Sequence, residues 1–394
     1  MNDSEIQIPE ILEYQFRKVD FPEKRLNLLV PSINPEHVFG GISTALKFFD
    51  ELVERTGYAS RIILTDSAPK REALKKYKYK YRLVRSSKNC DDRHQIVPYN
   101  SRYGESIAVS ENDTFIFTGW WTAYCTQTAY AKYEKQLNLA PNPFIYFIQD
   151  YEPGFYPWSS RYLLADSTYR TDYPQIAVFN SKLLYDFFKK EGYSFYKEYF
   201  FEPVLNSGLK TILLQYMGKE VEKKKKLLVY GRPSTERNAF SLVISILKEW
   251  VAQMDNVEDW EIVSAGEYHK NVDLGKGKYL VSVGKMSIEE YGQCMLETYA
   301  GISLMSSPHP SYPPLEMSEF GVKVITNNYA NKDLSKFNDN IISVDNVSPV
   351  NIANKLVDIC NHYTDKVKIK MGNKNYVENE KVFSFIDNVI EDLN

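Results

Sequence analysis

Short runs of leucine and β-branched residues alternate with amphipathic runs of helix length, and this alternation occurs twice along the 394-residue chain. The pattern is typical of βαβ units, in which helices cover both faces of a parallel sheet. The sequence therefore predicts an α/β protein with two Rossmann-like domains. At roughly 150 residues per domain, the length also favours two domains, and we expect a cleft between them.

The first half of the chain predicts five strands, at Leu26–Pro31, Ser60–Leu64, Thr114–Thr118, Phe144–Gln149 and Gln175–Phe179. Helices are expected between them at about Ser43–Glu54, Thr122–Glu134 and Ser181–Lys190. Residues 65–113 are rich in polar residues and tyrosine, and their weak periodicity supports no assignment.

The second half begins after the polar stretch 205–226, with strands expected at Leu227–Tyr230, Glu261–Ser264, Lys278–Val283, Gly301–Met305 and Lys323–Thr326. Its helices are expected at about Asn238–Met254, Ser287–Glu297, Pro314–Phe320 and Pro349–Ile359. Ser287 with Glu290 forms a capping box, and Gly321 ends a short helix. We therefore expect domains at 1–204 and 205–374, with one surface helix over 375–394 completing the first domain.

Composition excludes several classes of protein. A formal charge of -3 argues against a dedicated nucleic-acid binder. Met1–Glu10 has no features of a signal peptide, and no apolar run approaches the ~18 residues that span a bilayer. The four scattered cysteines favour a reducing compartment, so we expect a cytoplasmic protein. Neither H-E-x-x-H nor D-x-D occurs, so we expect no metal and no cofactor.

Two arginines follow the first strand of the second half. Gly231 and Arg232 end that strand, and Arg237 opens the next helix. Forked guanidinium donors match phosphate oxygens, so this pair could clamp a diphosphate. The alternative is that both are surface arginines in a solvated loop.

A second candidate segment runs from Met305 into a helix start. Backbone N–H groups of Ser311, Tyr312 and Leu315 could form an anion site there. Glu316 could accept hydrogen bonds from sugar hydroxyls. The alternatives are that Glu316 only complements the helix dipole and that His309 is an ordinary loop residue.

Two further candidates lie at strand ends in the first half. Gly40 and Gly41 follow the first strand and would let a ligand approach the backbone. Asp150 follows another strand and could orient or deprotonate an acceptor hydroxyl. A simple turn and a loop cap are the respective alternatives.

In their order along the chain, these four sites resemble the retaining glycosyltransferases of family 4, which have the GT-B fold. Gly231 to Asn238 is similar to the family segment G-R-x-x-x-E-K-G, with Arg237 in place of lysine and Asn238 in place of glycine. The resemblance implies that Arg232 and Arg237 bind the donor diphosphate and stabilise the leaving group.

The resemblance extends to other segments of the second half. Gly284, Lys285 and Met286 resemble the turn that binds the nucleotide base, and Gly266 resembles the end of the adjoining strand. Glu316 matches the last residue of the family's E-x7-E motif and would bind the ribose. Pro308 stands where the first glutamate is usual, so the donor sugar would be held differently, through His309 or backbone groups of the loop that include Ser311 and Tyr312.

In the first half, Gly41 lies where the family has a glycine-rich loop, and Gln149-Asp150 replaces a common His-Asp pair. The segment 306–316 resembles most closely the bacterial rhamnosyltransferases that build surface and S-layer glycans from dTDP-rhamnose. The resemblance implies a nucleotide-sugar donor on the second domain and a glycan acceptor on the first, with metal-independent transfer that retains configuration. The alternatives are a sugar-nucleotide epimerase of the same architecture and a non-catalytic carbohydrate-binding module.

Basic and aromatic residues alternate over Lys75–Arg82, and as a strand this stretch would place a row of cations on one face and tyrosines on the other. Such a face could bind an anionic membrane surface or a lipid-diphosphate-linked acceptor, so we expect peripheral contact with the inner face of the cell membrane. An edge strand protected by lysines is the alternative.

Overall fold

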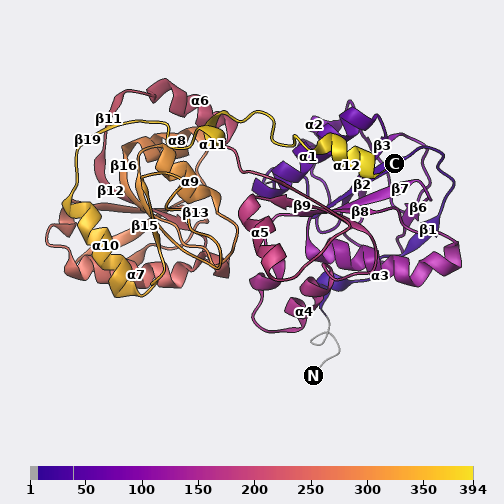
Figure 1. Cartoon of the computed structure of the whole chain (residues 1–394), viewed down its shortest axis with the longest axis horizontal. Helices are drawn as coiled ribbons and strands as arrows, with labels where there is room; N and C mark the ends of the chain where they lie inside the picture. The colour runs from indigo at the N-terminus through magenta and orange to yellow at the C-terminus, as the bar shows by residue number, and fades with distance from the viewer. Residues whose placement is uncertain (1–7, 39, 394) are drawn as a thin grey trace. The chain divides into compact units, whose positions relative to one another are not determined.

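The computed structural model describes residues 8–38 and 40–393, and the chain divides into two compact units. The first unit runs up to Phe201 and is rejoined by the chain from Phe383 onward, and the second spans Glu202–Val382. Each unit contains a parallel sheet with helices on both faces (Figure 1). The predicted α/β fold class is confirmed.

The first unit is built on an eight-stranded parallel sheet. Its spatial order is β10 (Lys197–Phe201), β9 (Gln175–Asn180), β8 (Phe144–Ile148), β7 (Asp113–Phe117), β2 (Arg25–Val30), β3 (Ala59–Leu64), β5 (His94–Pro98) and β4 (Arg82–Leu83). The chain order reverses at β2, which pairs with β3 on one side and β7 on the other. The other elements are η2 (Pro9–Ile11), β1 (Phe16–Lys18), α1 (Gly40–Thr56), α2 (Arg71–Tyr77), β6 (Ile107–Val109), α3 (Trp120–Leu137), η3 (Glu152–Phe155), α4 (Ser160–Ser167), α5 (Lys182–Lys190) and α12 (Ile386–Asp392).

The central strands of this sheet are buried along their whole length, which explains why most of their residues are apolar. α1 and α12 lie on one face, and α3 and α4 lie on the other (Figure 1). Rings such as Phe117, Phe144 and Tyr146 fill the core beneath α3, with centroids 5.0 to 5.7 Å apart. Aromatic packing thus accounts for many of the tyrosines and phenylalanines of this unit.

The second unit has a seven-stranded sheet in the order β14 (Val272–Gly275), β15 (Lys278–Gly284), β13 (Glu261–Gly266), β12 (Lys224–Gly231), β16 (Thr298–Ile302), β17 (Lys323–Asn327) and β18 (Ile341–Val344). All neighbours are parallel except β14, which is antiparallel to β15. The other elements are α6 (Ser207–Tyr216), β11 (Glu220–Glu222), η4 (Glu236–Asn238), α7 (Phe240–Gln253), η5 (Val257–Asp259), α8 (Ile288–Glu297), α9 (Tyr312–Glu319), α10 (Pro349–Asn361), β19 (Lys366–Lys368) and α11 (Lys374–Glu378). α7 packs beside α10 (Figure 1).

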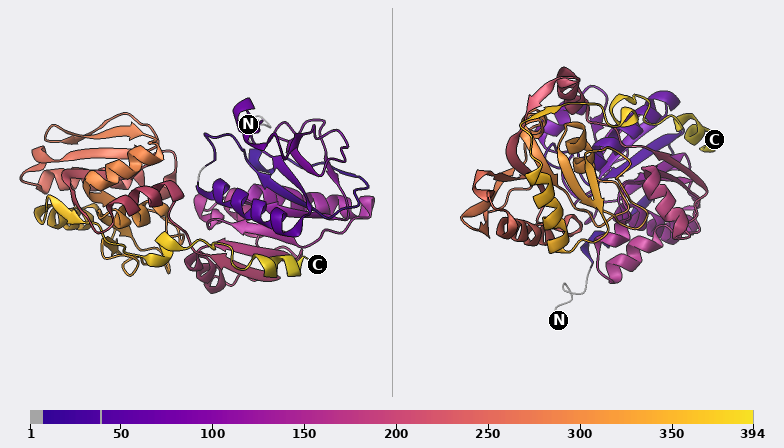
Figure 2. Two further views of the ribbon diagram at one scale, coloured as in Figure 1. Left: turned by 90° about the horizontal axis from the view of Figure 1, so that it is seen from above. Right: turned by 60° about the vertical axis from the view of Figure 1, so that its left-hand side comes forward.

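The predicted helix over 375–394 is wrong. α11 ends before the extended residue Asn379, and α12 begins only at Ile386. Between them Phe383 inserts its ring among Phe48, Phe147 and Phe201 of the first unit. The apolar residues of this segment therefore anchor the returning chain, whose yellow end lies with the first unit in each view (Figure 2).

Three other assignments change. The stretch Lys75–Arg82 does not form the strand considered for it, because α2 extends to Tyr77 and a turn follows, with Tyr77 and Tyr81 buried. The expected strand Gly301–Met305 lies earlier in the structure, at β16, because α8 ends at Glu297 and the chain extends at once. The stretch 205–226 contains α6, whose Leu209, Ile212 and Leu213 are buried. Within the described part of the chain, no helix is long and apolar enough to cross a membrane.

Candidate donor site in the second unit

Four adjacent strands of the second unit bring the predicted donor residues to one edge of the sheet. β15, β13 and β12 end at Gly284, Gly266 and Gly231, and the loop 303–311 follows β16. β12 is the strand at which chain order reverses, because it pairs with both β13 and β16. In open α/β sheets, ligands bind outside the carboxyl ends of the strands at such a switch point.

Gly266, at the end of β13, occupies a position where a side chain would not fit. Its φ of +136° is strained for other residues, and a Cβ atom there would lie 2.5 Å from the carbonyl oxygen of Gly231. The next residue, Glu267, accepts hydrogen bonds from the backbone N–H and the hydroxyl of Ser234, at 3.0 and 2.7 Å. These bonds lower the pKa of Glu267 and fix the turn that contains Arg232.

Sequence reasoning missed Glu267 and also His269, whose Nε2 lies 2.8 Å from the hydroxyl of Ser264. Glu267 directly follows β13, and His269 lies two residues further along the chain. A polar side chain just after a glycine-ended strand was the available signal for Glu267.

The loop with the two arginines is joined to the loop after β16. The backbone N–H of Thr235 donates to the carbonyl of Arg232, and the backbone N–H of Ser306 donates to the carbonyl of Arg237 at 2.7 Å. Both arginine side chains are half-buried. The reversal of strand order at β12 thus brings Arg237 and Ser306, which are 69 positions apart in the sequence, into one site.

The loop 303–311 is fixed near its start by hydrogen bonds between the Met305 backbone and buried side chains. The backbone N–H of Met305 donates to Oδ1 of Asn327 at 2.7 Å, and Nδ2 of Asn327 and Nζ of Lys332 both donate to the Met305 carbonyl. Asn327 and Lys332 are buried. A loop fixed in this way can present its groups to a ligand with little loss of entropy on binding.

The expected anion site at the start of α9 needs one correction. The backbone N–H of Ser311 donates to Nδ1 of His309 at 3.0 Å, so Ser311 does not offer it to a ligand. Because Nδ1 accepts this bond, a neutral His309 ring carries its proton on Nε2. Ser311 has a φ of +68°, and the chain enters α9 at Tyr312.

Glu316 lies on α9 beside Tyr291. Burial raises the pKa of Glu316 to about 7, and the carboxyl group in turn raises the pKa of the Tyr291 hydroxyl after the larger effect of burial. A carboxyl group that loses water on folding is a strong acceptor when it is ionised and meets a hydroxyl donor. Near neutral pH the Glu316 carboxyl group is therefore partly protonated and partly ionised.

The predicted base-binding turn follows β15. Gly284 has a φ of +65°, Lys285 is exposed and Met286 is half-buried. The capping box is confirmed: the Ser287 hydroxyl accepts from the backbone N–H of Glu290, and the Glu290 carboxylate accepts from that of Ser287. The capping box therefore fixes the start of α8 immediately after this turn in the chain.

In the first unit, Gly41 lies in the first turn of α1 against Gln149, which follows β8. A Cβ atom at Gly41 would lie 1.5 Å from Oε1 of Gln149, so the glycine makes room for this side chain. Asp150 is buried, and its Oδ1 accepts from the backbone N–H of Tyr151 at 2.8 Å. Asp150 therefore makes the loop-capping contact, which leaves its role toward an acceptor as a prediction.

Solved structures that resemble this chain in architecture include a glycosyltransferase and a sucrose-phosphate synthase. The chain superimposes on WaaG, a glycosyltransferase involved in lipopolysaccharide biosynthesis, with a TM-score of 0.56, 10% identity, and coverage of 94% of this chain and 99% of that one. For Anabaena HepE, solved with UDP-glucose, the TM-score is 0.52 at 10% identity, with coverage of 86% and 90%. Two Rossmann-like units with these likenesses define the GT-B fold of glycosyltransferases.

The family is given by two matches, one in each unit. The N-terminal domain of WsaF matches residues 25–182, and the C-terminal domain of WsaF matches residues 225–357. The chain therefore belongs to the WsaF family and contains both of its domains. It is also 26% identical over 291 residues to the O-antigen biosynthesis protein RfbC of Myxococcus xanthus. That match takes in 74% of this chain but only 21% of the relative, so the chain spans about a fifth of its length.

Proposed function

We propose that the chain is a glycosyltransferase that moves a sugar from a nucleoside-diphosphate donor, bound by the second unit, to a hydroxyl of a growing polysaccharide, bound by the first. The observation that carries this proposal is the junction of two loops at β12, where Arg232 and Arg237 lie on one loop and Ser306 begins the approach to Glu316. A site with two guanidinium groups and a carboxyl group suits a diphosphate and a ribose.

The two arginines would act on the leaving group. As the bond between the sugar and the diphosphate breaks, negative charge grows on the diphosphate oxygens, and preformed cations stabilise that charge. Arg232 and Arg237 would supply this charge without a metal ion. Glu316 would accept a ribose hydrogen bond, and the turn at Gly284, Lys285 and Met286 would hold the base.

The finer assignment is a dTDP-rhamnose donor, transferred with retention of configuration. It is supported by the resemblance of 306–316 to bacterial rhamnosyltransferases and by Pro308, which replaces the carboxylate of the hexose-binding motif. His309 would then contact the donor sugar through Nε2, because Nδ1 is engaged by Ser311.

An aromatic platform in the first unit would bind the acceptor. Trp158 is 98% exposed and stacks on Tyr162 with an interplanar angle of 3°. The Tyr162 hydroxyl lies 3.1 Å from that of Tyr151, the residue after Asp150. A flat exposed ring suits the apolar face of a sugar, and Asp150 would orient the hydroxyl that attacks.

The chain would work at the cytoplasmic face of the membrane on a glycan linked to a lipid diphosphate. Lys75, Lys76, Lys78 and Lys80 are exposed on the end of α2 and the turn after it. Basic side chains near an anionic leaflet add roughly 1 kcal/mol each to membrane binding.

The proposal is tested by incubating the protein with dTDP-rhamnose, UDP-glucose or GDP-mannose, with and without a rhamnose-containing oligosaccharide, and with or without EDTA. Mass spectrometry should show an acceptor that gains one deoxyhexose only with dTDP-rhamnose, with EDTA present. NMR of the new linkage gives the configuration. A changed sugar nucleotide without acceptor would favour the epimerase, and glycan binding with no turnover of any donor would favour the binding module.

A further inference from the structure

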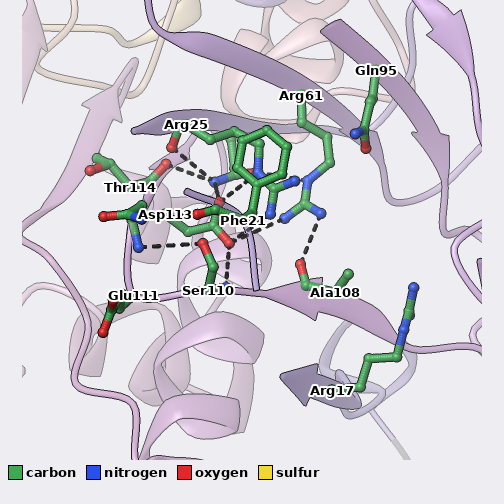
Figure 3. A network of polar contacts seen from close by, with 12 residues as sticks. Arg17, Phe21, Arg25, Arg61, Gln95, Ala108, Ser110, Glu111, Asp113 and Thr114 are labelled. Carbon is green, nitrogen blue, oxygen red and sulfur yellow. Dashed lines mark hydrogen bonds and ion pairs between the residues drawn. The ribbon is translucent and has the colours of Figure 1, made fainter. Parts of the chain in front are cut away.

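Three charged residues are buried at the amino edge of the first unit's sheet, away from the carboxyl ends that lead to Gly40 and Asp150. Arg25 begins β2, Arg61 lies in β3 and Asp113 begins β7 (Figure 3). Each is at most 2% exposed. Two guanidinium groups thus share one carboxylate in the interior.

Arg25 and its neighbours satisfy that carboxylate. Nε and Nη2 of Arg25 donate to the two oxygens of Asp113 at 2.7 and 2.9 Å, and Asn27 and the backbone N–H of Ser110 supply two more bonds. The ring of Phe21 covers the Arg25 guanidinium at 4.2 Å. Arg25 and Asp113 therefore form a complete ion pair.

Among the residues that the structure describes, Arg61 has no carboxylate of its own, because Asp113 is already paired with Arg25. Its Nε donates to Asn27 and its Nη1 to the carbonyl of Ala108, at 2.7 and 2.8 Å. Its Nη2 makes no hydrogen bond within the described residues and lies 3.9 Å from an Asp113 oxygen (Figure 3). Burial and the adjacent Arg25 lower the pKa of Arg61 to about 9. A buried charge without compensation is costly, so the site is one anion short.

Arg61 lines a cavity of about 290 Å³, which is larger than a phosphate ion needs. Most of the surface that lines it is polar, because Phe21, Val97 and Ile107 are almost fully buried. The occupant that this lining fits is therefore a polar, charged group.

The exposed rim of the cavity carries one more cation than it carries carboxylates. Lys18, Arg85 and Lys88 lie there with two carboxylates, Asp20 and Asp91. These cations add to the positive field of Arg61, which attracts and retains an anion.

One more residue fixes the rim. Arg17 donates to the backbone carbonyls of Ser86 and Lys88 and to that of Ser106. The loop that holds Arg85 and Lys88 is therefore tied to β1 and formed in advance of binding.

We propose that this cavity binds a small anion, whose phosphate or carboxylate group balances the charge of Arg61 and is held by Arg85 and Lys88 on the rim. The site is separate from the donor loops of the second unit and does not depend on the proposed function. Because the ligand completes the charge balance of the folded state, it stabilises the first unit by linkage.

The test uses the full chain in an Arg232→Ala, Arg237→Ala background, so that phosphate binding at the donor loops is removed. Calorimetric titration and thermal unfolding are followed with inorganic phosphate, glucose 1-phosphate, benzoate and neutral glucose, at constant ionic strength. We expect an anion to bind and raise Tm, and glucose to do neither. Glucose 1-phosphate and benzoate distinguish phosphate from carboxylate chemistry.

Two variants locate the binding. Arg61→Gln, which keeps hydrogen-bond donors but loses the charge, should weaken binding by about tenfold or more. The double variant Arg85→Ala, Lys88→Ala on the rim should weaken anion binding as well. If Arg61→Gln does not fold, this double variant provides the test. Lys135→Ala, an exposed change on α3, is the matched control. Failure of every anion to bind the parent protein, or unchanged binding in the rim pair together with any folded Arg61→Gln protein, would overturn the proposal.

Discussion

The backbone N–H of Ser306 donates to the carbonyl of Arg237 at 2.7 Å, and this bond ties the loop after β12 to the loop after β16. The two strands are neighbours only because the chain order reverses at β12. The predicted donor residues consequently depend on each other: a shift of either loop displaces the groups on the other.

Removing either guanidinium should impair turnover and spare the fold. Arg232→Ala or Arg237→Ala is expected to lower kcat by about 10² to 10³, because each loses one preformed positive group aimed at the leaving diphosphate. Initial rates and far-UV circular dichroism are the measurements. Lys248→Ala, an exposed change on α7, should leave both unchanged, and near-normal activity of both arginine variants would rule out the clamp.

Glu316→Gln should stabilise the free protein in a pH-dependent way. Burial raises the folded-state pKa of Glu316 from the ordinary value of 4.5 to about 7. The ionised form therefore destabilises the fold at pH 7 and above, and this penalty disappears as the pH falls to 4.5. Urea unfolding should show a gain of up to about 3 kcal/mol at pH 8 and almost none at pH 4.5. The same gain at both pH values would contradict this.

The same variant separates stability from binding. Because an ionised Glu316 would accept the ribose hydrogen bond, Glu316→Gln should weaken donor binding at pH 8 even though the protein is more stable. Wild-type donor affinity should fall as the pH drops below 7. Glu289→Gln, an exposed change on α8, is the control for both measurements.

Gly266→Ala should disrupt the strand end. The φ of +136° and the contact of 2.5 Å with the Gly231 carbonyl cannot both be kept with a Cβ atom present. We expect a loss of about 1 to 3 kcal/mol in the free energy of unfolding and a large loss of nucleotide affinity. Gly275→Ala is the matched control, because its φ is +90° but no atom lies within 4 Å of the added methyl group. Its nucleotide affinity should remain normal.

Trp158→Ala should affect only the acceptor. Loss of the exposed ring removes a stacking surface of roughly 1 kcal/mol, so KM for the glycan should rise several-fold and KM for the donor should not change. Steady-state kinetics with each substrate varied in turn measures this. Tyr103→Ala removes a ring that is 95% exposed elsewhere in the unit and should alter neither constant. Equal changes in both KM values would count against the platform.

Membrane binding should depend on the end of α2. The wild-type protein should co-sediment at low salt with vesicles that contain anionic lipid. Replacing Lys75, Lys76, Lys78 and Lys80 by glutamine should abolish this, at roughly 1 kcal/mol for each charge. Vesicles of neutral lipid are the control. If wild-type protein stays in the supernatant with anionic vesicles at low salt, the proposed membrane contact is wrong.

Local patterns predicted the elements that carry strong signals. The buried strands β8 and β9 stand close to their expected ranges because near-continuous apolar runs leave little freedom. The start of α8 was predictable because Ser287 and Glu290 satisfy each other's backbone groups locally. By contrast, the helix over 375–394 was mispredicted because the spacing of Val382, Phe383 and Phe385 does not reveal which core Phe383 enters.

By itself, the sequence determined the α/β class, both parallel sheets and the residues that stand at the strand ends, because period and turn chemistry are local properties. The packed fold was needed to show that β12 lies between β13 and β16, which joins Arg237 to Ser306, and that the Ser311 N–H donates to His309. It also decided that Arg61 is buried with part of its charge unbalanced. These relations depend on strand order and on contacts between distant residues, which no local pattern encodes.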